Sequence, residues 1–283
     1  MTCGEGSSSV FANPELVRIQ EYNGPEEDGY ITPDSKYLFF DSHTDDPSIP
    51  TKQYYATAID YKTFTFQGEV RGVNYPLQNG SKPMSLDGNM DLSGHFYFMT
   101  TSFYSHSLMT TYAGTFNNGV VTNVAPVLGI SHNQTGWLTM AAEITSDGNI
   151  LYYGDTHMGS NGYPISSRIA VASKNADGSF IKLSNSDELL ANVNATGDVL
   201  YNAMASANGL ELFFTKSDSS ARTLTIYSAS RNLKSVAFSV PIQIVAAGTK
   251  AESGSISADG KHLYYHDFRA DPKSPKIYVL SRP

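Results

Sequence analysis

The sequence predicts an all-β fold, a single five-bladed β-propeller of four-stranded antiparallel blades. Three observations lead to this prediction. A strand–turn–strand unit occurs five times, the five turns follow one another at a nearly constant spacing, and the chain begins with a strand that the last unit lacks. The composition agrees, since the chain has 18 Tyr and 14 Phe in 283 residues and almost no helical periodicity.

The clearest unit is ESGSISADGKHLYYHDF, residues 252–268, in which Asp259-Gly260 separates two runs of strand-forming residues. An Asp-Gly pair in this setting predicts a hairpin, because glycine adopts positive φ without steric penalty. The equivalent turn residues of the five units are Asp34, Ser93, Asp147, Asn208 and Asp259. Their intervals of 59, 54, 61 and 51 residues are typical of a repeat architecture built from strands.

The two ends of the chain predict how the ring closes. Residues 10–19, VFANPELVRI, resemble residues 236–245, VAFSVPIQIV, which form an outermost strand after the third strand of the fourth unit. The last unit ends at its third strand, so we expect the N-terminal strand to complete the last blade. Composition predicts that residues 1–9 are a flexible tether and that residues 10–283 form one propeller domain.

A column of small residues lies five positions before each turn residue. We interpret it as the place where the innermost strands approach one another around the axis. Its members are Gly29, Gly88, Ala142, Ala203 and Gly254.

Charge and cysteine content limit the partners. A net charge of −8 and a pI of about 5.3 argue against nucleic acid, and no apolar run reaches the roughly 18 residues of a membrane span. The single cysteine, Cys3, excludes an intrachain disulfide. Its setting, MTCGEGSSS, resembles the mature end of a bacterial lipoprotein, and the alternative is an incidental cysteine. We expect an extracytoplasmic monomer that contacts a membrane only through a lipid on Cys3.

The repeated pattern of an acidic residue, a short strand, S-x-D-G and L-Y-F resembles the WD40-like PD40 repeats of TolB-type β-propellers. The third to fifth units match best, and the second departs with DLSGHFYF. The resemblance covers nearly the whole chain. It implies a periplasmic or cell-surface interaction module, although some related propellers are enzymes.

Three carboxylates at the starts of innermost strands form the first candidate site: Asp28, Asp87 and Glu143. Their order on the first three blades is similar to that in five-bladed glycoside hydrolases. This resemblance implies Asp28 as base or nucleophile, Asp87 as the residue that tunes pKa, and Glu143 as general acid. The alternative is a structural role, because such repeats carry an acid near this position, and Glu27 and Glu252 are of that kind.

Two further candidate sites fall on the face that carries the long loops, because binding and catalytic residues concentrate on loops held by a rigid scaffold. Imidazoles and carboxylates follow the second strands, and His43, His157 and His266 are candidate ligands of a divalent metal, with exposed histidines that bond to loops as the alternative. Exposed aromatic residues beside polar groups suit a sugar or a peptide. The candidate ligand-binding residues are Trp137, Tyr104, His157, Asp155, His266 and Asp267. Alternatively, Trp137 fills a gap between blades.

No G-x-S-x-G turn, phosphate-binding glycine loop or cysteine nucleophile occurs. The sequence therefore predicts first a binding module for a glycan, a peptidoglycan fragment or a protein segment on the loop-rich face. The alternative is a glycoside hydrolase-like enzyme with its carboxylates at the mouth of the axial channel.

Overall fold

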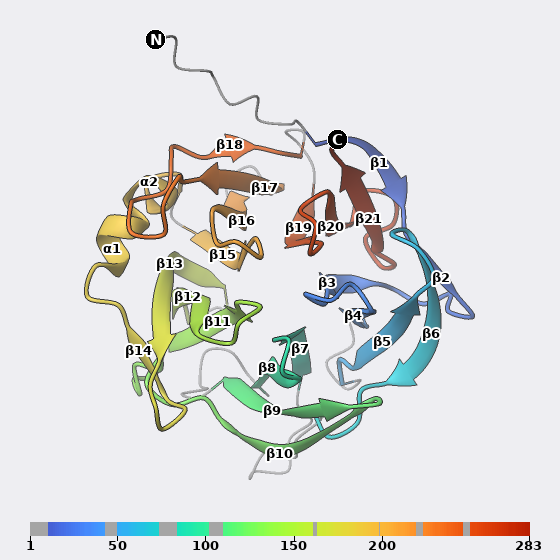
Figure 1. Cartoon of the computed structure of the whole chain (residues 1–283), viewed down its shortest axis with the longest axis horizontal. Helices are drawn as coiled ribbons and strands as arrows, with labels where there is room; N and C mark the ends of the chain where they lie inside the picture. The colour runs from blue at the N-terminus through green and yellow to red at the C-terminus, as the bar shows by residue number, and fades with distance from the viewer. Residues whose placement is uncertain are drawn as a thin grey trace.

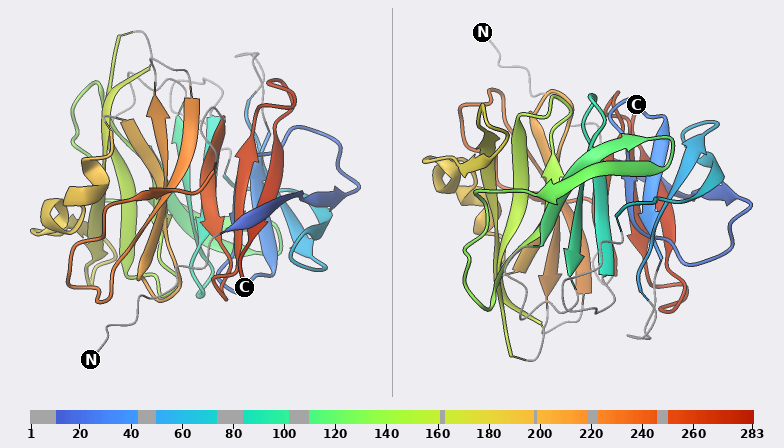
Figure 2. Two further views of the ribbon diagram at one scale, coloured as in Figure 1. Left: turned by 90° about the horizontal axis from the view of Figure 1, so that it is seen from above. Right: turned by 90° about the horizontal axis from the view of Figure 1, so that it is seen from below.

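The computed structural model describes residues 11–42, 50–73, 84–101, 110–160, 163–197, 199–218, 223–245 and 250–283. Five antiparallel blades surround one axis, as Figure 1 shows, and the side views in Figure 2 show their strands running between two faces. The predicted five-bladed β-propeller is confirmed.

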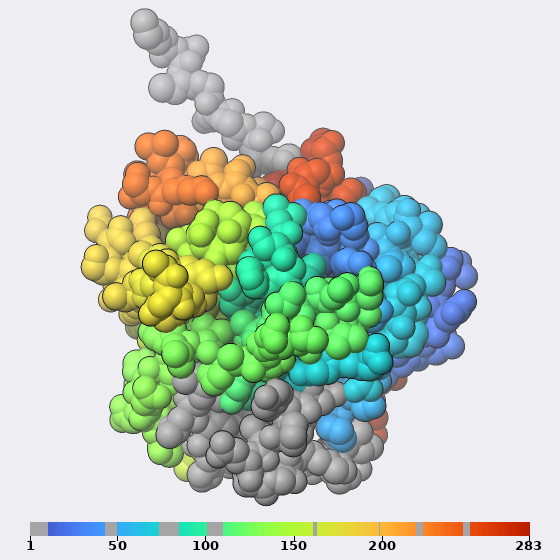
Figure 3. All heavy atoms as spheres, turned by 60° about the horizontal axis from the view of Figure 1, so that its bottom comes forward, coloured from blue at the N-terminus to red at the C-terminus, as the bar shows by residue number. Residues whose placement is uncertain are grey.

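Each blade starts at the axis and ends at the rim. Blade one contains β3 (Glu27–Ile31), β4 (Tyr37–Asp41), β5 (Gln53–Ala58) and β6 (Thr63–Glu69). Blade two contains β7 (Met84–Met90), β8 (His95–Thr101), β9 (Thr111–Asn117) and β10 (Val120–Pro126). Figure 3 shows one side of the rim, where the blue-to-cyan atoms of blade one lie beside the green atoms of blade two.

The remaining blades follow the same order. Blade three contains β11 (Trp137–Ile144), β12 (Ile150–Met158), β13 (Pro164–Lys174) and β14 (Phe180–Lys182). Blade four contains β15 (Val199–Ala205), β16 (Glu211–Asp218), β17 (Thr223–Ser230) and β18 (Ile242–Gln243). Blade five contains β19 (Ala251–Ile256), β20 (His262–Asp267) and β21 (Lys276–Ser281). A parallel pair, Ser167 with Val199, joins the sheets of blades three and four.

The N-terminal segment closes the ring and confirms the predicted completion of the last blade. Strand β1 (Ala12–Leu16) pairs antiparallel with β21 of blade five. The chain then crosses to blade one, where β2 (Arg18–Gln20) pairs in parallel with β6, a contact that the sequence pattern did not predict. Val17 and Ile19 are buried at this crossing.

The innermost strands contact one another in the closed order β3, β7, β11, β15, β19 and back to β3. Side chains cross between them. The Ser255 hydroxyl of β19 accepts the Ile31 N–H of β3, and the Asn89 amide of β7 bonds to the backbone of Ala142 and Ile144 in β11. The apolar core lies between blades, because each strand presents alternate side chains to the blade before it and the blade after it.

Three details differ from the predicted pattern. The outer strand of blade four, expected over residues 236–245, is regular only at Ile242–Gln243. Two short helices, α1 (Ser186–Leu189) and α2 (Ala191–Asn194), cover blades three and four with buried side chains that include Leu189 and Val193. The first turn of blade two is one residue shorter than those of the other blades, since Asp91 N–H bonds to the carbonyl of His95 whereas Thr32 N–H bonds to that of Tyr37.

Removal of the closing segment should destabilise the whole domain. Phe11, Val17 and Ile19 are all less than a tenth exposed, and burial of each such side chain contributes about 1.5–3 kcal/mol. Deletion of residues 1–20 should therefore remove on the order of 5 kcal/mol from a typical total of about 5–15 kcal/mol. Thermal melting checks this, with deletion of residues 1–10 as the matched control. Equal melting temperatures for the two truncated proteins would contradict the closure.

Candidate axial site

A β-bulge occurs at the same place in all five innermost strands. In each blade, two consecutive residues of the first strand lie opposite one residue of the second strand, so the register of the pair shifts there. The first of these two residues has a left-handed backbone conformation, which is unusual for a residue other than glycine. These residues are Asp28 (φ 48°), Asp87 (φ 56°), Ala141 (φ 46°), Asn202 (φ 49°) and Ser253 (φ 60°).

The second residue of each bulge belongs to the predicted column of small residues, and the structure corrects the reason for its size. A Cβ on Gly29 would lie 2.8 Å from Ile277 Cδ1, and one on Gly88 would lie 2.6 Å from Gln53 Oε1. These neighbours belong to the third strand of the preceding blade. The column is small because adjacent blades pack against it, and not because the strands crowd at the axis.

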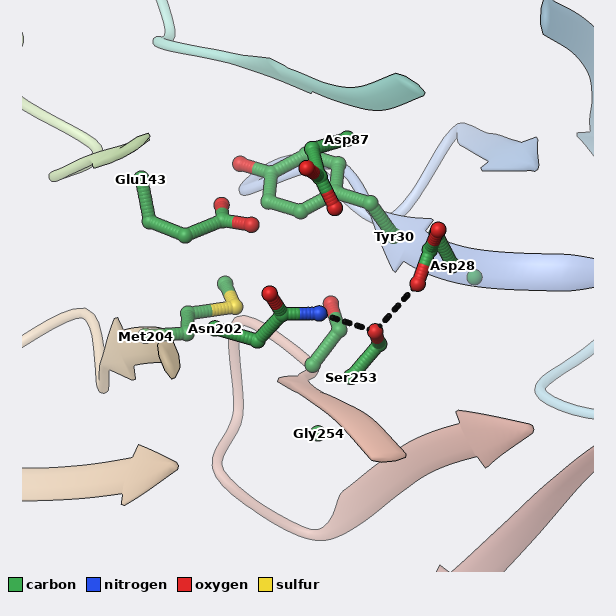
Figure 4. A pocket seen from close by; sticks show the side chains of 10 residues that line it. Asp28, Tyr30, Asp87, Glu143, Asn202, Met204, Ser253 and Gly254 are labelled. Carbon is green, nitrogen blue, oxygen red and sulfur yellow. Dashed lines mark hydrogen bonds between the residues drawn. The ribbon is translucent and has the colours of Figure 1, made fainter. Parts of the chain in front are cut away.

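Because the bulges recur around the ring, they aim side chains into one axial pocket. Its lining includes all three predicted catalytic carboxylates together with Asn202 and Ser253. Figure 4 shows Asp87 and Glu143 extending toward a common space, with Asp28 beside it. The space inside this pocket is about 10 Å³, which is room for roughly one water molecule.

A chain of two hydrogen bonds through blades four and five supports Asp28. The Ser253 hydroxyl donates to Asp28 Oδ1, and the Asn202 side-chain amide donates to Ser253 Oγ, as the dashed lines in Figure 4 show. Burial raises the pKa of Asp28, and the charge of Glu252 adds to the rise, while His266 and the two hydrogen bonds oppose it. The net shift is upward.

His266 links Asp28 to Glu252. Its Nδ1 accepts the backbone N–H of Asp28 at 3.0 Å, and its Nε2 lies 3.1 Å from Glu252 Oε1. Burial would lower the pKa of His266, but Glu252 and Asp28 raise it to about 9. Nδ1 can accept the Asp28 N–H only while it carries no proton, so the ring in this arrangement is neutral and donates from Nε2 to Glu252. The raised pKa means that the ring readily gains a second proton, which would displace the Asp28 N–H. Tyr201 donates the second hydrogen bond to Glu252, at 2.6 Å.

Burial and neighbouring negative charges raise the pKa values of Glu143 and Asp87. Glu143 Oε2 is buried without a hydrogen-bond partner, and burial together with the charge of Asp28 raises the pKa of Glu143 to about 8. Burial, followed by the charges of Asp28 and Glu143, raises the pKa of Asp87 well above its ordinary value. A carboxyl that keeps its proton near neutral pH can donate it to a leaving group.

Trp137, His157 and Asp155 lie together on blade three. The Trp137 ring stacks on His157 at 4.8 Å and packs against His132 at 4.5 Å. His132 Nε2 lies 2.5 Å from Asp155 Oδ1. The contact with His157 is within blade three, and His132 lies in the segment between β10 and β11, so these ring contacts do not show Trp137 filling a gap between blades. The ring is half-buried.

The other predicted site residues lie in different surroundings. Asp267 is buried and bonds to the backbone and side chain of Arg269. His157 packs on Trp137, whereas His266 faces Glu252 and Asp28, and no group of three or more His, Cys, Asp or Glu within the described ranges has the arrangement of a metal site. Tyr104, His43 and Cys3 lie outside the described residues, so the metal site stays a prediction.

Sequence reasoning missed Asn202 and Ser253, which support Asp28. A signal for them is present, because both lie six residues before their turn residues, at the positions that Asp28 and Asp87 occupy in blades one and two. A pattern of carboxylates alone does not include them, since neither residue is an acid. Asp41 and Glu252 also approach the acidic group, and the spacing of the turns does not single them out.

Comparisons with known proteins support the fold. No family model matches the chain, and no curated protein matches its sequence. The structure is similar to a family 117 glycoside hydrolase produced by the marine bacterium Zobellia galactanivorans, with 14% identity, a TM-score of 0.61, and coverage of 96% of this chain and 90% of that one. It is also similar to a second protein described as a glycoside hydrolase, with 8% identity, a TM-score of 0.60, and coverage of 97% and 92%.

A third similar structure is the endo-arabinase from Bacteroides thetaiotaomicron, with 12% identity, a TM-score of 0.54, and coverage of 95% of this chain and 97% of that one. At these identities the similarity shows the shared fold alone. The resemblance to PD40 repeats therefore stays a prediction at the level of the family. No helix in the described part of the chain is long and apolar enough to cross a membrane.

The raised pKa of Glu143 should appear in the stability of the protein. The folded-state pKa of about 8 exceeds the ordinary 4.5, so the stability contributed by the bound proton is lost as the pH rises from about 4.5 to about 8. Glu143→Gln stays neutral and should lose about 2–4 kcal/mol less than the wild type over this range. Urea unfolding at several pH values measures the difference. Parallel pH curves would contradict the assignment, and Glu188→Gln, on an exposed residue, is the control.

Proposed function

We propose that the protein is a carbohydrate-active propeller that cleaves a glycosidic bond at the axial pocket. The observation that carries the proposal is that carboxyl groups from the innermost strands of blades one, two and three line a single pocket. Glycosidic cleavage requires an acid and a base or nucleophile on either side of the scissile bond. The similarity to propeller-fold proteins described as glycoside hydrolases and as an endo-arabinase supports this class of substrate.

Each carboxyl has a role that fits its surroundings. Glu143, with its raised pKa and unpartnered oxygen, is the general acid. Asp28 is the base, since the hydrogen bond from Ser253 and the nearby His266 offset part of the rise in its pKa. Asp87 has the role of tuning pKa values in the acidic group, in which burial and the charges of Asp28 and Glu143 also raise its own pKa.

The size of the pocket limits how a glycan binds. A volume of about 10 Å³ holds roughly one water molecule and no sugar ring. The glycan therefore lies across the mouth, and only the glycosidic oxygen and one water reach the carboxyls. The Asp28 side chain is 17% exposed.

Loss of the proton donor should abolish turnover. Glu143→Gln keeps the shape of the side chain, so it should lower kcat by about 10²–10⁴-fold while KM changes little. Release of reducing sugar from a panel of plant and algal glycans measures this, and Glu188→Gln is the matched control on an exposed helix residue. Full activity of Glu143→Gln would disprove the role of the acid.

A second candidate function is glycan binding without turnover, and the narrow axial pocket favours it. In this case the half-buried Trp137 ring, next to His132, His157 and Asp155, forms the platform for a sugar. Trp137→Ala should weaken glycan affinity about tenfold, because aromatic residues commonly contribute more than 1 kcal/mol to an interface. Titration calorimetry measures this, with the exposed Tyr163→Ala as control. Glycan binding that is equal in both variants would exclude the platform.

A further inference from the structure

The bulge that carries Asp87 is anchored by a side chain from the preceding blade. Asp41 Oδ2 accepts the Asp87 backbone N–H at 2.9 Å. The strand pairings place Thr215 and His266 at the equivalent position of blades four and five. Thr215 Oγ1 accepts the N–H of Ser253, and His266 Nδ1 accepts the N–H of Asp28.

The other two blades lack such an anchor. Their equivalent residues are Met99 and Gly154, which have no side-chain oxygen or nitrogen to accept a hydrogen bond. The anchored bulges are therefore the two that carry Asp28 and Asp87 and the one that carries Ser253, the hydrogen-bond donor to Asp28. The side-chain acceptor is therefore present at the bulges that carry or support the proposed catalytic aspartates, and it is not a general feature of the repeat.

Gln53, directly opposite Asp41 in the next strand, departs from the repeat. Ile169, Ile226 and Ile277 occupy its position in blades three to five. Gln53 is fully buried, and a Cβ on Gly88 of the Asp87 bulge would meet its amide oxygen. A polar side chain here is costly, because Gln53 Oε1, Gln53 Nε2 and Asp41 Oδ1 all lack a hydrogen-bond partner.

The charges around Asp41 indicate how this pair is satisfied. Asp41 is 1% exposed. The charged groups that affect it are all acidic: Glu27 and Asp28 on β3 and Asp87 on β7. Burial, followed by these charges, raises its pKa well above the ordinary value. A protonated Asp41 can donate its O–H to the amide oxygen of Gln53. Its other carboxyl oxygen can accept a hydrogen bond from the Gln53 amide N–H and from the Asp87 backbone N–H. A rotation of the two side chains into this arrangement would give all three unpartnered atoms a partner.

We propose that Asp41, as a neutral acid paired with Gln53, is a positioning residue that holds the Asp87 bulge in the axial site. Asp41 touches the backbone of Asp87 and not a substrate. The expected effect of Asp41 on turnover rests on the proposed hydrolase function. The expected effect of Asp41 on the Asp87 backbone is independent of that function.

The test replaces Asp41 and Gln53 by the residues that occupy the equivalent positions in blade four. Asp41→Thr with Gln53→Ile reproduces the Thr215–Ile226 pair and keeps an acceptor for the Asp87 N–H. Asp41→Val with Gln53→Ile has nearly the same shape without the acceptor. Hydrogen exchange of the Asp87 amide, followed by NMR, and kcat and KM on a cleaved glycan are measured for both.

We expect the threonine variant to retain slow exchange at Asp87 and a kcat within about threefold of the wild type. The valine variant should exchange faster at Asp87 and lose about tenfold to a hundredfold in kcat with little change in KM, since misplacement of a catalytic group acts on the reaction step. Equal exchange and equal kcat in the two variants would overturn the proposal.

Asp41→Asn tests the neutral state separately, because asparagine keeps the shape, the acceptor and the lack of charge. It should behave as the wild type in both measurements, and a loss as large as that of the valine variant would show that the charge of Asp41 matters. Asp91→Asn, a buried aspartate in the turn at the opposite face, is the control. If the wild type cleaves no glycan, the hydrolase function fails, and amide exchange alone still decides whether Asp41 positions Asp87.

Discussion

The bulge in each innermost strand is the constraint on which the axial site depends. It forces one residue per blade into a left-handed conformation and turns its side chain toward the axis. Because the ring has five blades, five such positions meet, and Asp28, Asp87, Asn202 and Ser253 occupy four of them around one pocket. The left-handed conformation is a feature of the repeat, since Ala141 adopts it as well. The chemical properties of the pocket depend on which side chain each blade has at this bulge position.

Concentrated negative charge is the second feature of the site. Asp28, Asp41, Asp87 and Glu143 all have raised pKa values, and His266 is the neighbouring base that bonds to Asp28. Buried carboxylates that repel one another lower their energy by keeping protons. Protonated and ionised acids can therefore stand side by side, which glycosidic cleavage requires.

Internal repetition separates structural residues from functional ones. In three blades an isoleucine packs at the same position between neighbouring blades. Blade one has Gln53 there instead, and the side-chain oxygen and nitrogen of Gln53 are buried without hydrogen-bond partners. The turn residues Asp34 and Asp147 accept a hydroxyl hydrogen bond from the residue two positions before, which explains them without any site. The departure at Gln53 therefore points to the axial site more clearly than any single acid does.

The sequence alone determined the number of blades, their strand order and the closure by the N-terminal strand, because turn chemistry and strand periodicity are local properties. It also placed Asp28, Asp87 and Glu143 near the axis, since all three lie on innermost strands, which meet around the axis. Only the tertiary structure decided the bulges, the narrow pocket and the contacts of Asp41 and His266. Those depend on which side chains of neighbouring blades face each other, and a single turn one residue shorter in blade two shifts that register.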